Sequence, residues 1–384
     1  MRKSLRSAVV ASILIPFLAI PQPAFAWGNT GHEVVAWIAW QHMTPTTRAK
    51  VSALIAQVPP ITHTNADGTV QTIAGHDLWV QDLPAGITDD QKQMFLFMRA
   101  ATWADSLKHR FLRDSDNPAT DPNPDSNIGF ADTFSHGYWH FIDQPFGTAA
   151  TATSTPPDVP KNCFVGTREK VPPTPVTSLP DIPAPNAATE IAKLRDALSS
   201  GETPDLQAYD LLWLEHLVGD VHQPLHGAVR FVNGDGDVGG NCVDITVPAA
   251  IAAKFKAGYD ADAALGLKVA KKYTPPSELH AFWDSLPGTA GAIDVQFAAK
   301  VAATIPKASA SVTDTDPAHW AKESLQKSQA SVYHLPIGPA LGVPVHYTIT
   351  NTYLANAKKV ANGRLALAGE RLANLLNATF DPHP

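Results

Sequence analysis

The sequence has only two cysteines, Cys163 and Cys242, among 384 residues. This excludes a framework of several disulfides and a zinc site built mainly from thiolates. In an oxidising compartment the two cysteines can still pair with each other. Any metal site in this chain must therefore rest on histidine and carboxylate side chains, and the sequence supplies 15 His and 36 Asp or Glu residues.

Positive charge is also scarce. The chain has 29 Lys and Arg residues and a formal net charge of −7. A protein of this balance does not attract nucleic acid through a broad basic face. If its substrate is a polyanion, bound metal ions rather than basic side chains would have to supply the compensating charge.

Long apolar runs are missing after the first 26 residues, and no later segment reaches the roughly 20 apolar residues that a membrane-spanning helix needs. The first 26 residues have the features of a secretory signal: Arg2, Lys3 and Arg6, an apolar run at 9–20, and a small-x-small cleavage site ending at Ala26. Cleavage there would start the mature protein at Trp27 and change the formal charge from −7 to −10. We expect a secreted or periplasmic protein without a membrane anchor; an uncleaved anchor is the alternative.

Helix signals dominate the rest of the chain. Thr-Pro pairs at Thr44 and Thr203 predict N-capped helices to about Gln57 and through Asp220, and Pro275 opens a third helix to about Leu286. Apolar residues at three- and four-residue spacing predict further helices. Strand signals are few, with one hairpin expected within 229–247. We predict an all-α fold with at most a small hairpin; the other helices are expected at 32–43, 91–110, 187–199, 317–332 and 353–378.

Two long stretches resist assignment to helices or strands. Residues 114–135 are rich in Asp, Asn and Pro, and residues 144–185 are rich in Pro and Thr. Loops of this length in a compact domain are usually functional or mobile. Because helices that would have to share one site lie on both sides of each loop, we predict a single catalytic domain over residues 27–384.

Two His/Asp pairs lie at i, i+4 on predicted helices, which places both side chains of each pair on one helix face. The pairs are His216 with Asp220 and His280 with Asp284. A buried pair of this kind is either hydrogen-bonded or metal-bound. After the first pair, Pro224 ends the helix and lets His226 turn back toward the same face, whereas the intervening His222 is expected to cap the helix end or support a ligand.

Further candidate ligands lie upstream. Asp105 follows Trp103-Ala104 on a predicted helix, and His140 lies between aromatic residues. A free amine and carbonyl at Trp27 would form a five-membered chelate, and His32 lies within reach of it. Histidine and carboxylate ligands without cysteine suit catalytic rather than structural zinc. Satisfied core polar groups are the alternative for each fragment taken alone.

In order, these fragments resemble the zinc-dependent single-strand-specific nucleases of the S1/P1 type, within the superfamily of zinc-dependent phospholipase C. The resemblance runs from Trp27 to the last predicted helix. The matching motifs are W-G-x-x-G-H at 27–32, W-A-D at 103–105, W-H-F-I-D at 139–143, H-L-V-G-D-x-H-Q-P-L-H at 216–226, G-G-N at 239–241, H-x-x-W-D at 280–284 and A-G-x-R-L-A-x-x-L-N at 368–377.

The resemblance implies a role for each site residue. Asp143 would orient the attacking water, Asn241 would contact phosphate, and Phe141 would help to form a base pocket. Lys108 stands where the nuclease pattern usually has Arg, which keeps the charge but loses the bidentate fork. Three zinc ions would be held by Asp105, His140, His216 and Asp220; by His226, His280 and Asp284; and by the Trp27 amine and carbonyl, His32 and a bridging Asp220.

The implied activity is hydrolysis of phosphodiester bonds in single-stranded RNA and DNA by a metal-activated water. The products would carry 5′-phosphates, and the resemblance also implies 3′-nucleotidase activity in a monomeric protein. The alternatives are a phospholipase C that uses the same metals on a lipid headgroup, and a zinc-binding protein without catalysis. Sites with only three protein ligands leave coordination positions open, which structural zinc avoids.

Overall fold

A computed structural model of the chain describes residues 27–64, 68–108, 131–147, 182, 184–232, 235–253, 256, 275–288, 295–308, 312–333, 340–341 and 346–382. The predicted signal peptide, most of the two long loops and Cys163 lie outside these residues. Cys242 is disulfide-bonded, and Cys163 is the only other cysteine in the sequence.

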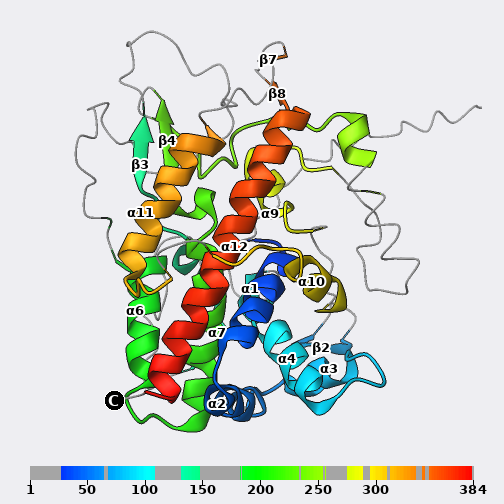
Figure 1. Ribbon diagram of the computed structural model, residues 1–384, viewed down its shortest axis with the longest axis vertical. Coiled ribbons are helices and arrows are strands. Elements are labelled where there is room, and N and C mark those ends of the chain that lie inside the picture. The colour runs from blue at the N-terminus through cyan, green and yellow to red at the C-terminus, as the bar shows by residue number, and fades with distance from the viewer. Residues whose placement is uncertain are drawn as a thin grey trace, which may run out of the picture.

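Helices make up most of the described structure, which confirms the all-α prediction (Figure 1). None of them combines the length and the apolar composition needed to cross a bilayer. The α-helices are α1 (Asn29–His42), α2 (Pro45–Ile55), α3 (His76–Gln81), α4 (Asp89–Ala100), α5 (Trp103–Lys108), α6 (Ala187–Leu198), α7 (Pro204–Val221), α9 (Leu279–Asp284), α10 (Val295–Ala302), α11 (Pro317–Lys327) and α12 (Asn351–Phe380). Two 3-10 segments, η1 (Gly137–His140) and η3 (Pro224–Gly227), and a π-helical turn, η4 (Ser328–Val332), accompany them.

Helix α7 forms the centre of the described structure. Every residue from 208 to 221 is buried, because α1, α2, α5, α6, α11 and α12 all pack against it. A helix that is covered on all sides needs no polar face, and its interior segment Leu211-Leu212-Trp213-Leu214 is correspondingly apolar. Any polar side chain on this part of α7 must find its partner inside the protein.

Helix α12 crosses the front of the molecule between α1 and α11 (Figure 1). At 30 residues it is about 45 Å long. Its close approach to α1 requires glycine at one position, because a Cβ on Gly369 would lie 2.5 Å from the Cβ of Ile38. One continuous hydrophobic cluster joins side chains from α1 through α12.

Strands are short and peripheral. Strand β4 pairs with β5 as an antiparallel hairpin, as expected for this region, and the hairpin of β1 and β2 was not expected from the sequence. Two small three-stranded sheets have the orders β3-β4-β5 and β6-β8-β7. The strands are β1 (Ile61–Thr64), β2 (Val70–Ala74), β3 (Pro145–Gly147), β4 (Val229–Val232), β5 (Asp235–Gly236), β6 (Ile245–Thr246), β7 (Ala340–Leu341) and β8 (His346–Thr348).

The stretch 91–110, expected as one helix, is interrupted. Helix α4 ends at Ala100 and α5 begins at Trp103. The Thr102 hydroxyl donates to the Arg99 carbonyl oxygen at 2.9 Å, a local bond of the kind that competes with helix continuation. The interruption leaves the Ala101 carbonyl oxygen available to a side chain of another helix.

The helix expected from Pro275 begins only at Leu279. Residues before it pair with an extended segment instead: the Ile245 amide donates to the Ser277 carbonyl oxygen, and the Leu279 amide donates to Val243, both at 2.9 Å. The sequence correctly predicted a helix here but placed its start four residues too early. The backbone groups of Ser277 and Leu279 bond to the segment at 243–245.

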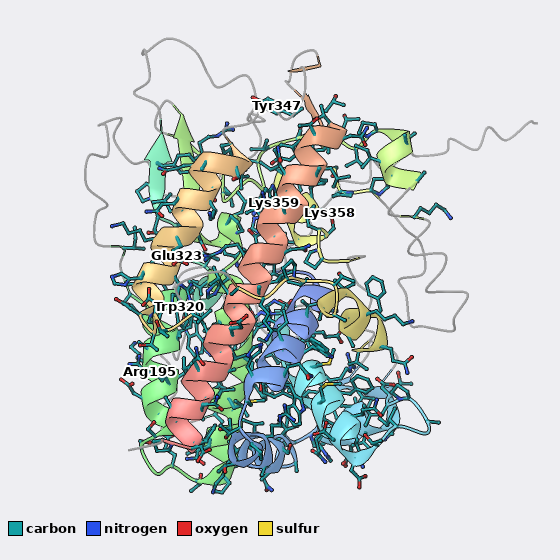
Figure 2. The ribbon with its side chains drawn as sticks, viewed as in Figure 1. Arg195, Trp320, Glu323, Tyr347, Lys358 and Lys359 are labelled. Carbon is teal, nitrogen blue, oxygen red and sulfur yellow. The ribbon has the colours of Figure 1, made fainter. Side chains whose placement is uncertain are left out.

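A buried ionic cluster ties α12 to α11 and to the end of α7. Arg364 and Arg371 are buried on α12, and both donate to Glu323 at 2.7 Å. Glu323 lies on α11 (Figure 2). Arg364 also donates to the His222 carbonyl oxygen at 3.0 Å. The His222 ring bonds to the Val218 carbonyl oxygen at 2.8 Å, which confirms its predicted capping role.

Glycine at position 219 of α7 lets α1 approach closely. A Cβ at this position would lie 2.7 Å from Nδ1 of His32, and the His32 ring cannot retreat because it stacks on His216 with centroids 3.8 Å apart. By contrast, a Cβ on Gly363 of α12 would meet nothing within 4 Å.

We predict that Gly219→Ala lowers the free energy of unfolding by about 1–3 kcal/mol, because it forces an extra methyl into a packed contact. The control Gly363→Ala should raise it by up to about 1 kcal/mol through helix propensity. Urea unfolding of the two variants measures both effects. Equal stabilisation by the two alanines would contradict the packing at Gly219.

A second prediction concerns Glu323. Burial alone would raise its pKa, but Arg371 and Arg364 outweigh burial and lower the pKa to about 2. A carboxylate with a depressed pKa stabilises the fold above its unfolded pKa, and this stability is lost as the pH falls through the folded pKa. Glu323→Gln should therefore cost about 2 kcal/mol at pH 7, with the difference from the wild type vanishing between about pH 4.5 and 2.

The matched control is Asp196→Asn, which breaks the surface pair of Asp196 with Arg195. Arg195 is labelled in Figure 2. Because this pair is exposed, its loss should cost less than about 1 kcal/mol at any pH. Chemical denaturation from pH 2 to pH 7 compares the variants, and a Glu323→Gln deficit that persists unchanged at pH 2 would contradict the ionic interpretation.

Candidate metal centre

Eight His and Asp side chains from six elements converge on one buried centre. All are nearly inaccessible to solvent. Acidic and imidazole groups are rarely buried together unless they are paired or bind metal. The residues are His32 on α1, Asp105 on α5, His140 on η1, His216 and Asp220 on α7, His226 on η3, and His280 and Asp284 on α9.

The ligand atoms form three groups in which all atoms lie within 4.8 Å of one another. One group joins His140, His216 and Asp220, and a second joins His226, His280 and Asp284. The third joins His32, Asp105 and His216. The sequence-predicted ligands among these eight residues are thus brought together, although the third group differs from the expected set.

Helix periodicity accounts for the two His/Asp pairs. Nε2 of His216 lies 3.3 Å from Asp220, and Nε2 of His280 lies 3.5 Å from Asp284. Segment η3 begins at Pro224, directly after α7, and returns the chain so that Nδ1 of His226 lies 3.8 Å from Asp220. The expected turn at Pro224 is therefore present.

Backbone carbonyl groups fix the orientation of the rings. Nδ1 of His216 lies 2.8 Å from the Ala101 carbonyl oxygen, in the break between α4 and α5. Nδ1 of His226 lies 2.7 Å from the His140 carbonyl oxygen, and Nδ1 of His280 lies 2.6 Å from that of Gly239. A carbonyl only accepts, so we assign the proton to Nδ1 in each ring, and Nε2 is left as a lone pair that points into the centre.

This assignment makes one contact unfavourable unless a cation is bound there. Nε2 of His226 and Nε2 of His280 lie 3.1 Å apart in the protein interior. When both rings are neutral and carry their one proton at Nδ1, neither Nε2 can donate to the other, so two lone pairs face each other. In a tetrahedral zinc site with Zn–N distances near 2.05 Å, two nitrogen ligands lie about 3.3 Å apart. The contact therefore fits a shared metal ion.

His32 lies deeper. Among the residues that the structure describes, neither ring nitrogen has a hydrogen-bond partner, although Nε2 is 3.4 Å from Oδ1 of Asp220. Burial, aided by the nearby His216, lowers the pKa of His32 to about 4, so the ring is neutral at neutral pH. A buried neutral imidazole with unused nitrogens is a ready metal ligand.

Asp220 occupies the middle of the centre. Its Oδ2 lies 2.8 Å from Nδ1 of His140, while its Oδ1 faces His32 and His226. Burial would raise its pKa, but His216, His140 and His32 together hold the pKa well below its usual range. The two oxygens of this one carboxylate thus face different groups of ligands.

The chain start lies beside the centre. Trp27 is fully buried, and the Gly28 amide donates to the Asp284 carbonyl oxygen at 3.1 Å. This contact holds residues 27 and 28 against α9. It places the predicted mature N-terminus next to the same set of ligands.

The other predicted site residues lie around the centre. Asp143 and Phe141 are half-buried in the segment after η1, which is anchored by the Ile142 amide donating to the His226 carbonyl oxygen at 2.8 Å. The Asn241 amide nitrogen donates to the Val238 carbonyl oxygen at 2.7 Å and lies 3.2 Å from Nδ1 of His280. The backbone of Lys108 ends α5, and its side chain is outside the described part of the structure.

One residue that orients a candidate ligand was not predicted from the sequence. Gln223 is fully buried, and its Nε2 donates to Oδ1 of Asp284 at 2.8 Å, which orients that carboxylate. Its place between His222 and Pro224 gave a weak signal, because a polar residue beside a helix end is ordinarily a surface residue. The carbonyl partners Ala101 and Gly239 could not be found from side-chain patterns at all.

The chain was compared with known proteins and with protein families. No curated protein sequence matches the chain. The family model for the S1/P1 nucleases, however, matches residues 27–381, nearly the whole chain. The family is zinc-dependent, and the chain carries several possible His/Asp metal-ligand groups. The chain belongs to the S1/P1 nuclease family, and its function is that of a nuclease that hydrolyses phosphodiester bonds.

Proposed function

We propose that the protein is a zinc-dependent endonuclease that hydrolyses single-stranded RNA and DNA to products with 5′-phosphates, with additional 3′-nucleotidase activity. The observation that carries the proposal is the facing pair of Nε2 atoms of His226 and His280, 3.1 Å apart and buried. A hydrolase of phosphodiesters has a use for cations at this point, because anionic phosphate oxygens repel a nucleophile.

Three zinc ions fit the available donors. Bound zinc would neutralise phosphate oxygens and lower the pKa of a coordinated water. A bridging Asp220 would explain why its two oxygens face different histidines. We assign the ions to Asp105, His140, His216 and Asp220; to His226, His280 and Asp284; and to Trp27, His32 and Asp220.

The surrounding residues bind and orient the reactants. Asp143, held in the segment that bonds to His226, would accept a hydrogen bond from the attacking water. Asn241 would donate to a phosphate oxygen from beside His280, and Phe141 would stack on a base. Lys108, which stands where the family pattern usually has Arg, would add a single positive charge.

The charge of the chain favours a flexible strand. At −7 overall, the protein repels a long duplex, and a local cluster of cations offsets this repulsion at one point only. Single strands can enter a narrow site and be held by stacking. We also propose that the protein acts as a monomer after export and cleavage behind Ala26, in the periplasm or outside the cell, since Trp27 can ligate metal only as a free amine.

A substrate comparison tests the proposal. The mature protein should cleave single-stranded RNA and single-stranded DNA at least tenfold faster than duplex DNA, and it should release phosphate from 3′-nucleotides. A chelator should abolish these activities and added Zn²⁺ should restore them. Hydrolysis of a phosphatidylcholine substrate in preference to nucleic acid would contradict the proposal in favour of a phospholipase C, and zinc binding without any hydrolysis would indicate a non-catalytic protein.

A second prediction concerns the chain start. An extra Met before Trp27 converts its nitrogen into an amide, which does not coordinate Zn²⁺ at neutral pH, whereas a free α-amine can lose its proton to a metal. The extended form should retain one zinc fewer and turn over single-stranded RNA at least tenfold more slowly than the form that begins at Trp27. Metal analysis and initial rates measure both.

The matched control lengthens the chain at its other end, after Pro384, where the predicted ligands are not affected. Equal zinc content and equal rates in the two N-terminal forms would show that Trp27 is not a ligand.

A further inference from the structure

Two of the ligand histidines take their orientation from loops rather than from helices. Nε2 of His140 lies 3.4 Å from the Ser135 carbonyl oxygen, and Nδ1 of His280 lies 2.6 Å from that of Gly239. Each carbonyl is adjacent to a residue in left-handed conformation. His136 has φ 39° and Val238 has φ 56°, and these are the only non-glycine residues with positive φ in the described part of the chain.

Such a conformation costs about 1 kcal/mol or more per residue, and it persists only where the surroundings enforce it. The same type of strain therefore recurs at the two loops that orient ligands. Each loop must contain a group that holds the strained backbone in place.

In the loop before η1, which contains Ser135 and His136, the group that holds the backbone is Asp132. Its Oδ1 accepts from the Phe134 amide at 3.1 Å, from Nε2 of His136 at 3.2 Å and from the Tyr209 hydroxyl at 3.1 Å. The His136 ring is further fixed by stacking on Trp139, with centroids 3.9 Å apart. Asp132 thus ties the loop on both sides of Ser135 and attaches it to α7 through Tyr209.

In the loop after β5, which contains Val238 and Gly239, the corresponding group is Asp237, which is fully buried. Its Oδ1 accepts from the Arg230 amide at 3.0 Å, and its Oδ2 accepts from the Tyr333 hydroxyl at 2.7 Å. Its own carbonyl oxygen accepts from the Cys242 amide at 3.1 Å, which closes the turn that contains Gly239. The turn is held against η3, since a Cβ on Gly239 would lie 2.7 Å from the Leu225 carbonyl oxygen.

We propose that Asp132 and Asp237 are positioning residues that each serve one half of the metal centre: Asp132 orients His140, and Asp237 orients His280. The two oxygens of a carboxylate offer several acceptor sites, so one Asp can collect donors from more than one element and tie a loop to its surroundings. The inference rests on the proposed metal-dependent function, and it adds two residues that the ligand pattern does not contain.

A residue that merely holds a loop would lower the stability of the metal-free protein and weaken all metal sites alike. A positioning residue affects its own site. Partners that orient ligands are typically worth a factor of 10–100 in metal affinity, so the two roles can be separated by asking which zinc each substitution weakens.

The test is a pair of double-mutant cycles read as zinc retained at buffered free Zn²⁺. Asp237→Ala should weaken one zinc about 10–100-fold. It should cause no further loss in a His280→Ala background but a clear additional loss in a His140→Ala background. Asp132→Ala should show the reverse pattern. The two substitutions act as matched controls for each other, because distant sites are additive and shared sites are not.

Tyr209→Phe and Tyr333→Phe provide a milder version of the same cycles. Each removes one hydroxyl donor from one anchor and keeps the carboxylate and the ring packing, so the fold survives even if an Asp→Ala variant does not. Each should weaken the zinc of its own half severalfold. Urea unfolding of the metal-free variants verifies that the losses do not follow from lower stability.

Zinc losses that are the same in both histidine backgrounds, or zinc retention equal to the wild type in all four variants, would overturn the inference and leave the proposed function intact. A wild-type protein that retains no zinc under these conditions would overturn the proposed function and the inference together.

Discussion

The arrangement depends on one contact, in which the Nε2 atoms of two neutral imidazoles, His226 and His280, face each other at 3.1 Å in the protein interior. We assign the proton of each neutral ring to Nδ1, where it is donated in a hydrogen bond to a carbonyl oxygen, so that neither Nε2 carries a proton. In a medium of low dielectric, such opposed lone pairs are costly unless a cation lies between them. This contact is therefore the main support for the proposal that the centre binds metal.

Much of the architecture can be understood as preparation for this centre. Helix α7 places His216 and Asp220 among helices that cover it on all sides. The absence of a side chain at Gly219 lets His32 of α1 lie against α7. The break between α4 and α5 frees the carbonyl group that orients His216. Behind the centre, Arg364 and Arg371 fix the end of α7 through His222, at the point where the chain turns toward His226.

The sequence predicted the helices well, and it picked out the His and Asp side chains that the fold brings together, since both follow from short-range patterns. A His/Asp pair at i, i+4 lies on one face of any helix, and Thr44 caps α2 as its sequence indicated, with its hydroxyl accepting from the Thr47 amide at 3.1 Å. Thr203 precedes α7 as expected but makes no side-chain cap bond. Two helix boundaries were predicted wrongly, the break near Ala101 and the start at Pro275. At both positions the backbone groups bond to residues far away in the sequence.

What the sequence could not predict is the support around the ligands. Gln223, the Ala101 carbonyl group and the two loop anchors Asp132 and Asp237 act through contacts between residues far apart in the chain. Their chemistry is ordinary, since they are an amide, a carbonyl group and two carboxylates, so no local pattern marks them. The hairpin of β1 and β2 escaped for a similar reason, because its strands are short and carry no strong alternation.

The most direct test of the central claim is anomalous diffraction at the zinc edge from crystals of the mature protein. The structure predicts an anomalous peak equidistant from Nε2 of His226 and Nε2 of His280 and next to Asp284, with further peaks beside Asp220. The claim would be contradicted if no peak lay between the two rings and one ring were flipped, so that a proton bridged the two nitrogens in place of a metal.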